Sequence, residues 1–490
     1  MMQKVKHNPE DRTTRDKFLD VYNVAKSVHL DNRSISVNGN NFNPTAYFGT
    51  LSAALNGNEL IQGDPGRGKT TSSEAISSLA YGTPLEIVQD SEVRGNAEAT
   101  EEKIKGTLDL GELNQGEEVI QWNDTVMMAP KIIDEINRLT PGTQGTILDA
   151  VDRNNWILKN ETVRSPDGPF YATANRQDAG NTEMPLAIRD RFDVSLEVGH
   201  PGHVNQEIID ERGPQVIEDI LNDAGTAEDI REITEDKSYR KNPRDAARSI
   251  TEIAGEFRTQ IEDDLTNLKG DGYKVLLPEP EDHDVALEQI DSVDLGDQAN
   301  MYLKFLDKDL NLCGFADGSR CNDSCEYTDV PAHTIAQLGG RATTSVRDYA
   351  KAAAWLEGSD TATMDHVDSI IPYALNHRAE FHNNPRNVEV KSQYDSGSHP
   401  IEFNISSQVA GQTRDRFEQK EDGLREAHTI QQQALYPSNF DDPLEPQEAL
   451  RELEDLAEQY DDGSDGFVQD YVRSVRDEIN ELHSGSDYGF

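Results

Sequence analysis

Residues 63–70 have the types and the spacing of a loop that binds phosphate. They read Gly-Asp-Pro-Gly-Arg-Gly-Lys-Thr and fit the pattern G-x-x-x-x-G-K-[ST]. Glycines let the backbone curl so that successive N–H groups point at phosphate oxygens. Lys69 would reach the β- and γ-phosphates, and the Thr70 hydroxyl would bind Mg²⁺. We therefore expect ATP to be held by Gly63, Asp64, Pro65, Gly66, Arg67, Gly68, Lys69, Thr70 and Thr71.

The flanking residues favour this interpretation over an ordinary glycine turn before a helix. The apolar pair Leu60-Ile61 precedes the loop, and a helical pattern of apolar residues follows it from Ala75 to Ala80. The phosphates would then lie at a helix N-terminus, where free N–H groups and the helix dipole favour anions.

Two later segments carry the other groups that ATP hydrolysis needs. Ile132-Ile133 runs into Asp134 and Glu135, and an apolar strand over 170–174 ends in Asn175. Asp134 at the end of a strand can hold Mg²⁺, and Glu135 can polarise the attacking water. An amide at the position of Asn175 can orient that water near the γ-phosphate. The sequence thus predicts an ATPase.

At this point the chain resembles the AAA+ ATPases and, within them, the MoxR group. The resemblance is carried by GDPGRGKT (63–70), DEINR (134–138), ATAN (172–175), DRF (190–192) and SVR (345–347). It implies that Asp134 and Glu135 are the second Walker pair, that Asn175 is sensor 1 and that Arg347 is sensor 2 on the lid, in the same site as Lys69. Arg191 would be the arginine finger that enters the ATP site of the neighbouring subunit.

The resemblance also implies a ring, with six subunits as the expected number and ATP at the subunit interfaces. By the same resemblance, the ring would act as a chaperone-like remodeller of a protein client. In the MoxR group that client often carries a von Willebrand A domain. Two alternatives stay open: a nucleic-acid motor similar to the MCM helicases, and a scaffold that binds and releases partners under nucleotide control. The polar strand 58–62 and a long insertion in the lid depart from the family pattern.

Three cysteines lie close together in a segment rich in turn-forming residues. Cys313, Cys321 and Cys325 are followed by His333, which gives a Cys₃His set of the kind that binds tetrahedral Zn²⁺. The spacing differs from that of the usual zinc knuckles, and three buried thiols are the alternative. We expect a structural zinc site within the lid insertion.

The composition is strongly acidic. The formal net charge is −46 over 490 residues, and the acidic residues are spread along the chain. A dispersed excess of this kind is typical of proteins from a high-salt cytoplasm, where salt screens the repulsion; disorder is the alternative, and the periodic apolar segments argue against it. No basic stripe that could neutralise phosphates is visible, so binding to nucleic acid is not expected. No apolar run is long enough to cross a membrane or to act as a secretory signal, which predicts a cytoplasmic protein.

The elements that must position these residues follow from the apolar periodicity. We expect an α/β AAA+ core with a parallel sheet, a helical lid with an insertion, and a helical C-terminal extension. The corresponding boundaries are 1–57 for a leading segment, 58–200 for the core, 201–378 for the lid with its insertion at about 222–335, and 379–490 for the extension. Within the core, 91–121 reads as an inserted segment and 156–165 as a hairpin. Thr344 is expected to cap a helix that ends at Gly358, with Arg347 in its first turn.

Overall fold

The chain begins with helices that pack beside the central sheet. The computed structural model describes residues 12–31, 33–114, 118–175, 184–211, 213–270, 272–311, 340–378, 401–459 and 467–483. Helix α1 (Thr14–Val28) is followed by a hairpin of β1 (Ile35–Val37) and β2 (Asn40–Phe42), and then by α2 (Pro44–Leu55). Thr13 begins α1 with a capping box, because its hydroxyl accepts from the Asp16 N–H and the Asp16 carboxylate accepts from the Thr13 N–H.

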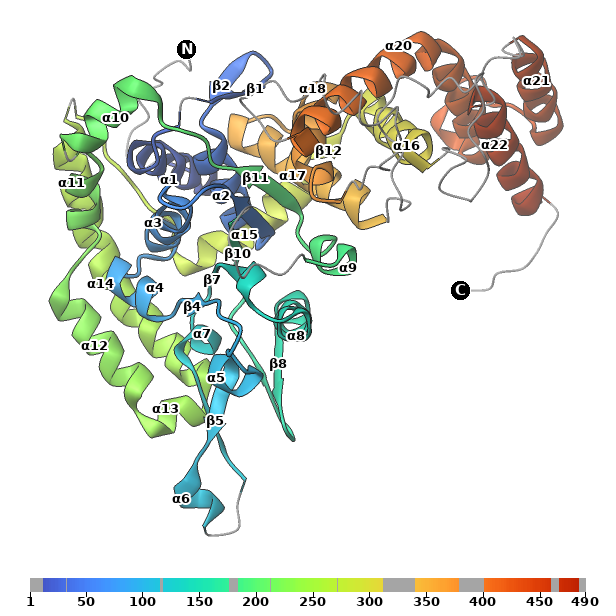
Figure 1. The fold of residues 1–490 in the computed structure, drawn as a ribbon. Helices are drawn as coiled ribbons and strands as arrows, with labels where there is room; N and C mark the ends of the chain where they lie inside the picture. Colours follow the sequence, from blue (N-terminus) through green and yellow to red (C-terminus); the bar gives the residue numbers. More distant parts are fainter. Residues whose placement is uncertain are drawn as a thin grey trace.

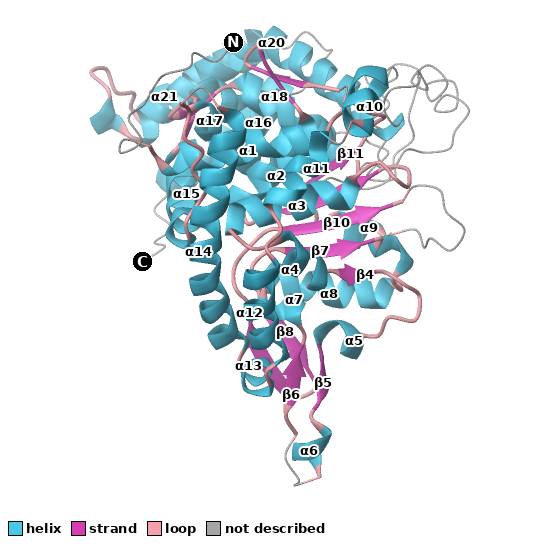
Figure 2. Ribbon diagram, turned by 90° about the vertical axis from the view of Figure 1, so that its left-hand side faces the viewer, coloured by secondary structure: helices cyan, strands magenta, loops and turns pink. Residues whose placement is uncertain are grey.

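A parallel sheet lies at the centre of the molecule. Over the described residues it has five strands in the order β11-β3-β10-β7-β4. The strands are β3 (Asn58–Gln62), β4 (Val93–Arg94), β7 (Lys131–Asp134), β10 (Phe170–Ala174) and β11 (Val194–Glu197). Figure 2 shows β11, β10, β7 and β4 one after another along the molecule. The predicted α/β core with a parallel sheet is confirmed.

Helices cover both faces of this sheet, and the alternation of side chains along β3 shows how. Ile61 belongs to the same buried cluster as residues of α1, α2 and α3, whereas its neighbour Leu60 packs on the other face with residues of α8. The helices of the core are α3 (Lys69–Tyr81), α4 (Leu85–Asp90), α5 (Glu101–Lys105), α7 (Asp124–Met127), the 3₁₀ turn η2 (Ile136–Arg138), α8 (Pro141–Arg153) and α9 (Leu186–Arg189).

Two hairpins project from the core. One pairs β5 (Gly106–Leu108) with β6 (Ile120–Trp122) and carries the short helix α6 (Leu110–Leu113) at its far end. The other pairs β8 (Asn155–Leu158) with β9 (Glu161–Arg164), which confirms the hairpin predicted over 156–165. In Figure 1 both extend downward from the sheet, with α6 at the bottom of the molecule.

A series of helices after β11 wraps along the side of the core. They are α10 (Gly202–Asp210), α11 (Gly213–Ile220), α12 (Ala224–Glu235), α13 (Lys237–Lys241), α14 (Pro243–Lys269) and α15 (Pro280–Ser292), whereas the next helix, α16 (Asp297–Asn311), packs against helices that follow it in the chain. Two of their side chains bind the last carbonyls of α3: His283 Nε2 lies 3.0 Å from Ala80 O, and Arg258 Nη2 donates to Tyr81 O at 3.3 Å. The far end of the helix that follows the phosphate loop is thus fixed by this region.

The lid helices lie beside β11 and α9. They are α17 (Gly340–Glu357) and α18 (Met364–Leu375), and a short pair of strands, β12 (Asp294–Leu295) and β13 (Thr361–Ala362), joins them to the preceding region. Gly358 follows α17 with a φ of +83°, as expected for the residue that ends a helix. The prediction that Thr344 begins this helix is wrong, because α17 is already helical from Gly340 and Arg347 lies in its interior.

The C-terminal part is helical and extends away from the core (Figure 1). It consists of α20 (Ile401–Leu435), the 3₁₀ turn η4 (Pro437–Asn439), α21 (Pro446–Gln459) and α22 (Phe467–His483). Leu453 of α21, Val472 of α22 and Leu424 of α20 are all buried, so the three helices share an apolar core. Among the described residues, no helix is both long enough and apolar enough to cross a membrane.

Candidate nucleotide site

The phosphate loop connects β3 to α3, as the sequence predicts. Gly66 and Gly68 both have a φ of +75°, a backbone conformation that residues with a Cβ rarely adopt. Gly63 lies against the start of the segment after β11, where a Cβ would come within 3.0 Å of Val198 O. The tip of the loop is exposed, and Arg67 lies 3.8 Å from the Asp64 carboxylate. Thr71 is half-buried in the first turn of α3.

Lys69 is buried at the first position of α3 and joins the loop to the sheet. Its ammonium donates to Gly63 O and Asp64 O, both at 2.9 Å, and to Asn175 Oδ1 at 2.8 Å. Burial lowers the pKa of Lys69, although the nearby carboxylates of Asp134 and Glu135 act in the opposite direction. The two predicted residues Lys69 and Asn175, 106 positions apart, are thus in direct contact.

Thr70 and Asp134 meet at the position where a Mg²⁺ ion would be expected. The Thr70 hydroxyl donates to Asp134 Oδ1 at 2.7 Å, and the hydroxyl of Thr173 donates to the same oxygen at 2.5 Å. Thr173 also accepts from the Glu135 N–H at 2.9 Å, so this buried residue fixes both acids. A hydroxyl and a carboxylate are ligands that suit Mg²⁺. Thr173 has no predicted role, and in the sequence only its position two residues before Asn175 points to it.

Both carboxylate oxygens of Glu135 are bound by side chains. Asn175 Nδ2 donates to Glu135 Oε1 at 2.6 Å, and Arg138 pairs with Glu135 Oε2 at 2.8 Å. The backbone of Glu135 is left-handed, with a φ of 54°, which is costly for a residue with a side chain. Gly95 permits this turn, because a Cβ at Gly95 would lie 2.1 Å from Glu135 O. From the sequence, Gly95 is predicted only to lie in an inserted segment.

Two further titratable residues lie close to the loop and were missed from the sequence. Burial raises the pKa of Glu92 to about 8, and the nearby carboxylates of Asp134 and Glu74 add to this effect. Burial lowers the pKa of His29 to about 4, so its ring is neutral at pH 7; a Cβ at Gly68 would lie 3.5 Å from His29 Nδ1. Neither residue belongs to a local pattern, so only the tertiary structure identifies them.

Arg191 lies at the other end of the strands. Asn58 Nδ2, at the start of β3, donates to Arg191 O at 3.0 Å, whereas the phosphate loop follows the last residue of β3. The guanidinium of Arg191 is half-buried against α8, where it pairs with Asp149 and lies 3.6 Å from Asp152. Within its own chain Arg191 is therefore separated from Lys69 by the length of a strand, roughly 15 Å.

Arg347 lies on α17, which contacts the same end of the sheet as Arg191 through Ser345. Ser345, two residues earlier, donates to Asp193 Oδ1 at 2.9 Å, and Asp193 immediately precedes β11. The side chain of Arg347 is 47% exposed and bonded to Asp348 at 2.9 Å. The structure does not bring Arg347 to the phosphate loop of its own chain.

The remaining predicted site residues cannot be placed. Cys313, Cys321, Cys325 and His333 lie outside the described residues, in 312–339. Within the ranges that the structure describes, no group of three or more His, Cys, Asp or Glu side chains is arranged to hold a metal ion.

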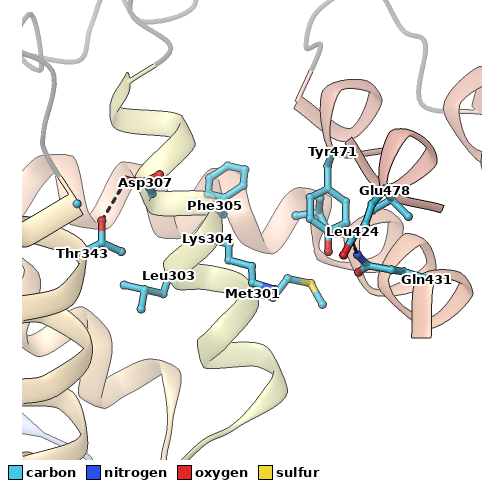
Figure 3. Close-up of a pocket in the computed structure, with 12 residues that line it drawn as sticks. Met301, Leu303, Lys304, Phe305, Asp307, Thr343, Leu424, Gln431, Tyr471 and Glu478 are labelled. Carbon is cyan, nitrogen blue, oxygen red and sulfur yellow. Dashed lines mark hydrogen bonds between the residues drawn. The ribbon is translucent and has the colours of Figure 1, made fainter. Parts of the chain in front are cut away.

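A cavity of about 430 Å³ lies far from the phosphate loop, between the lid and the C-terminal helices. Figure 3 shows Asp307 and Thr343 on one side of it, joined at 3.0 Å, and Tyr471 and Gln431 on the other. Of the predicted site residues that the structure describes, none lines this cavity, so it is separate from the candidate nucleotide site.

Known protein families match the two parts of the chain that carry this geometry. Residues 58–192 match the AAA domain of the dynein-related subfamily, and residues 332–395 match the AAA lid domain. The first match begins at the first residue of β3 and ends just after Arg191.

Individual relatives match shorter stretches. The Bacillus subtilis protein YeaC is 32% identical over 80 residues, which is 16% of this chain and 24% of YeaC. The structural protein ORF618 of Acidianus two-tailed virus is 29% identical over 140 residues, 28% of this chain and 22% of ORF618. The chain thus spans about a quarter of the length of these curated relatives.

One solved structure extends the likeness to most of the chain. The crystal structure of a candidate ATPase from Cytophaga hutchinsonii has a TM-score of 0.53 and 13% identity, covering 82% of this chain and 94% of that one. At this identity the likeness concerns the fold.

Proposed function

We propose that this chain, an AAA+ ATPase by its sheet order and by its matched AAA and lid domains, hydrolyses ATP with Mg²⁺ and uses the energy to remodel a protein client. One observation carries the catalytic part of the proposal. Lys69, Asn175 and Glu135 form a continuous line of hydrogen bonds, of 2.8 Å and 2.6 Å, beside the contact between Thr70 and Asp134. Phosphoryl transfer depends on such positioning and on charge stabilisation.

Each residue of this line has a distinct role in the proposal. Lys69 stabilises the γ-phosphate, Thr70 and Asp134 hold Mg²⁺, and Asn175 orients the attacking water. Glu135 polarises that water. Asn175 and Arg138 each bind one oxygen of Glu135, and each of these oxygens has a second lone pair with which it can accept from the water.

The catalytic assignment is tested with Glu135→Gln and Lys69→Ala. Glu135→Gln should keep ATP binding but lower kcat by about a hundredfold or more, because the amide cannot accept a proton. Lys69→Ala should weaken ATP binding itself, and chelation of Mg²⁺ should stop turnover of the unmodified protein. Glu232→Gln, at an exposed position of α12, serves as the matched control. Unchanged turnover of Glu135→Gln would refute the assignment.

The position of Arg191 supports a ring in which each ATP site is completed by a residue of the neighbouring subunit. An arginine supplied from outside a site stabilises the charge of the transition state. We propose that Arg347 also contributes to the ATP site of the neighbouring subunit. Arg341, on the same helix as Arg347, lies 3.6 Å from Asp152, and Asp152 also faces Arg191. A hexamer of the MoxR type is the form that we propose.

Mixed assemblies test this arrangement. Arg191→Ala subunits keep Lys69, and Lys69→Ala subunits keep Arg191, so each variant alone should hydrolyse ATP slowly, while a mixture contains complete sites. We expect the mixture to hydrolyse ATP faster than either variant alone. The same result is expected when Arg347→Ala replaces Arg191→Ala. No gain on mixing, although mass measurements show that the subunits assemble together, would refute a role in the neighbouring site.

A protein client is favoured by the two hairpins. Leu110 in α6 is 71% exposed, and Ile157 in β8 is 53% exposed, so apolar side chains face solvent at the end of the molecule away from the lid. Such exposed apolar groups fit a protein chain better than a charged nucleic acid. By the MoxR resemblance, the client proposed is a protein with a von Willebrand A domain.

A further inference from the structure

The loop that carries Arg191 is held through its backbone. It comprises residues 190–193, between α9 and β11, and each of its four carbonyl oxygens accepts a hydrogen bond. Asn58 Nδ2 donates to the carbonyl of Arg191 itself at 3.0 Å. The carbonyls of the other three residues all accept from one side chain, that of Arg378 in the lid.

Arg378 follows α18 and is 3% exposed. Its Nη2 donates to Phe192 O at 2.7 Å and to Asp190 O at 3.2 Å, and its Nη1 donates to Asp193 O at 3.1 Å. Its Nε donates to the Asp190 carboxylate at 3.1 Å. A guanidinium offers five N–H groups in one rigid plane, so it can fix several acceptors at once in a way that an ammonium cannot.

The two residues before Arg378 make the same kind of contact. His377 Nε2 lies 2.9 Å from Phe192 O, and Asn376 Nδ2 donates to Ser195 O at 2.7 Å. The end of α18 is therefore bonded to the Arg191 loop and to the start of β11. A movement of the lid would pull directly on the backbone on both sides of Arg191.

The side chain of Arg191 is held much less firmly than its backbone. It pairs with Asp149, whose side chain is 58% exposed, and with Asp152 at 3.6 Å. Ion pairs with an exposed partner such as Asp149 contribute about 0–1 kcal/mol and are readily exchanged, and the partner Asp152, which is 20% exposed, is held only at the longer distance. The guanidinium of Arg191 can thus leave α8 for a phosphate while its backbone stays fixed.

From these contacts we infer that Arg378 is a positioning residue, which sets the place of Arg191 and links it to the orientation of the lid. The inference rests on the proposed role of Arg191 in the ATP site of the neighbouring subunit. Rate depends steeply on such placement, because a shift of about 1 Å can cost on the order of a hundredfold. Arg378 itself does not touch the nucleotide in this scheme.

The test uses the full chain with Arg378→Lys, which keeps the charge but not the planar fork. We expect kcat for ATP to fall about tenfold or more, with KM and the affinity for a non-hydrolysable ATP analogue nearly unchanged. Asp190→Asn weakens only the contact with Arg378 Nε and should cause a smaller loss of kcat. If Arg378→Lys does not fold, this second variant tests the inference. Arg414→Lys is the matched control, since Arg414 joins α20 to Asp365 and Asp368 of α18 without touching the Arg191 loop.

A double-mutant cycle separates positioning from a general structural effect. If Arg378 acts through Arg191, then Arg191→Ala combined with Arg378→Lys should have the kcat of Arg191→Ala alone. Losses that multiply, or a wild-type kcat for Arg378→Lys where Arg191→Ala is impaired, would overturn the inference. Full turnover of Arg191→Ala would instead overturn the proposed role of Arg191, and the inference with it.

Discussion

At the scale of single residues, Glu59 explains why the strand before the phosphate loop is polar. Its carboxyl is fully buried, and Glu59 Oε2 accepts from the Ser52 hydroxyl at 2.8 Å. Ser52 Oγ also lies 2.8 Å from the hydroxyl of Tyr349 in α17. Burial raises the pKa of Glu59 to about 8, so the carboxyl is neutral at pH 7 and joins α2, β3 and the lid through hydrogen bonds.

Glu59 should therefore make stability depend on pH. The ordinary pKa of 4.5 applies in the unfolded chain, and a pKa of about 8 applies in the folded protein. Between these values unfolding releases a proton, so the free energy of unfolding falls as the pH rises, by about 1.4 kcal/mol per unit. Glu59→Gln has no titratable carboxyl at this position. Urea unfolding at several pH values from 5 to 9 should therefore show a smaller decline in the free energy of unfolding for this variant than for the wild type.

The comparison of the two proteins isolates Glu59, because other buried groups titrate equally in both. Above about pH 8 both the folded and the unfolded carboxyl are ionised, so the difference between wild type and variant should become constant there. Curves that stay parallel from pH 5 to 8 would contradict the prediction. Glu232→Gln again provides an exposed control.

At the scale of elements, parallel strands bring the candidate catalytic groups together. β7 ends in Asp134, β10 ends just before Asn175, and β3 ends at the phosphate loop, so all three groups meet at one edge of the sheet. The opposite edge holds Arg191 and the lid, through Asn58 and Asp193. One domain therefore presents a nucleotide-binding edge and an arginine-bearing edge, which is the asymmetry that a head-to-tail ring requires.

The β5–β6 hairpin is the element in which we expect client contact. Lys241 of α13 donates to Glu112 in α6 at 2.8 Å, so the end of the hairpin is braced by a helix that follows the sheet. Replacing Leu110 and Leu113 by Ser should leave basal ATP hydrolysis unchanged but remove its stimulation by a client. Reduced and alkylated lysozyme, which cannot fold, is a suitable probe.

Val285→Ser is the matched control for the hairpin variant, since Val285 is also an exposed apolar residue but lies on α15. Stimulation that survives in the hairpin variant, or is lost equally in the control, would contradict the prediction. Stimulation by DNA instead of protein would favour the nucleic-acid motor.

At the scale of the whole molecule, the charge should govern stability. A net charge of −46 on 490 residues creates electrostatic repulsion, and this repulsion increases on folding because the like charges come closer together. At 1 M salt the screening length is about 3 Å, compared with about 10 Å at 0.1 M, so most of this repulsion is removed. We expect the thermal midpoint to rise when KCl is increased from 0.1 to 2 M, and NaCl should act similarly. A midpoint that stays constant or falls in both salts would contradict the prediction.

The sequence alone is sufficient to identify those candidate site residues whose position depends on local structure. The phosphate loop, Asp134, Glu135 and Asn175 each lie at the boundary of one strand or helix, and the apolar pattern of that element is sufficient to place them. The β8–β9 hairpin was predictable for the same reason. The capping of α17 by Thr344 was predicted wrongly, because a helix that starts earlier satisfies the same apolar pattern.

Only the tertiary structure decided which distant residues meet. Thr173 and Gly95 shape the acidic pair, and Glu59 is buried beneath the lid, yet none of these contacts follows a sequence period. The same holds for Arg347, which α17 carries toward the start of β11, and for Arg378, whose partners in the Arg191 loop lie 185–188 positions earlier in the chain. Their places depend on how the lid packs against β11, and this packing is set by long-range contacts that local spacing does not encode.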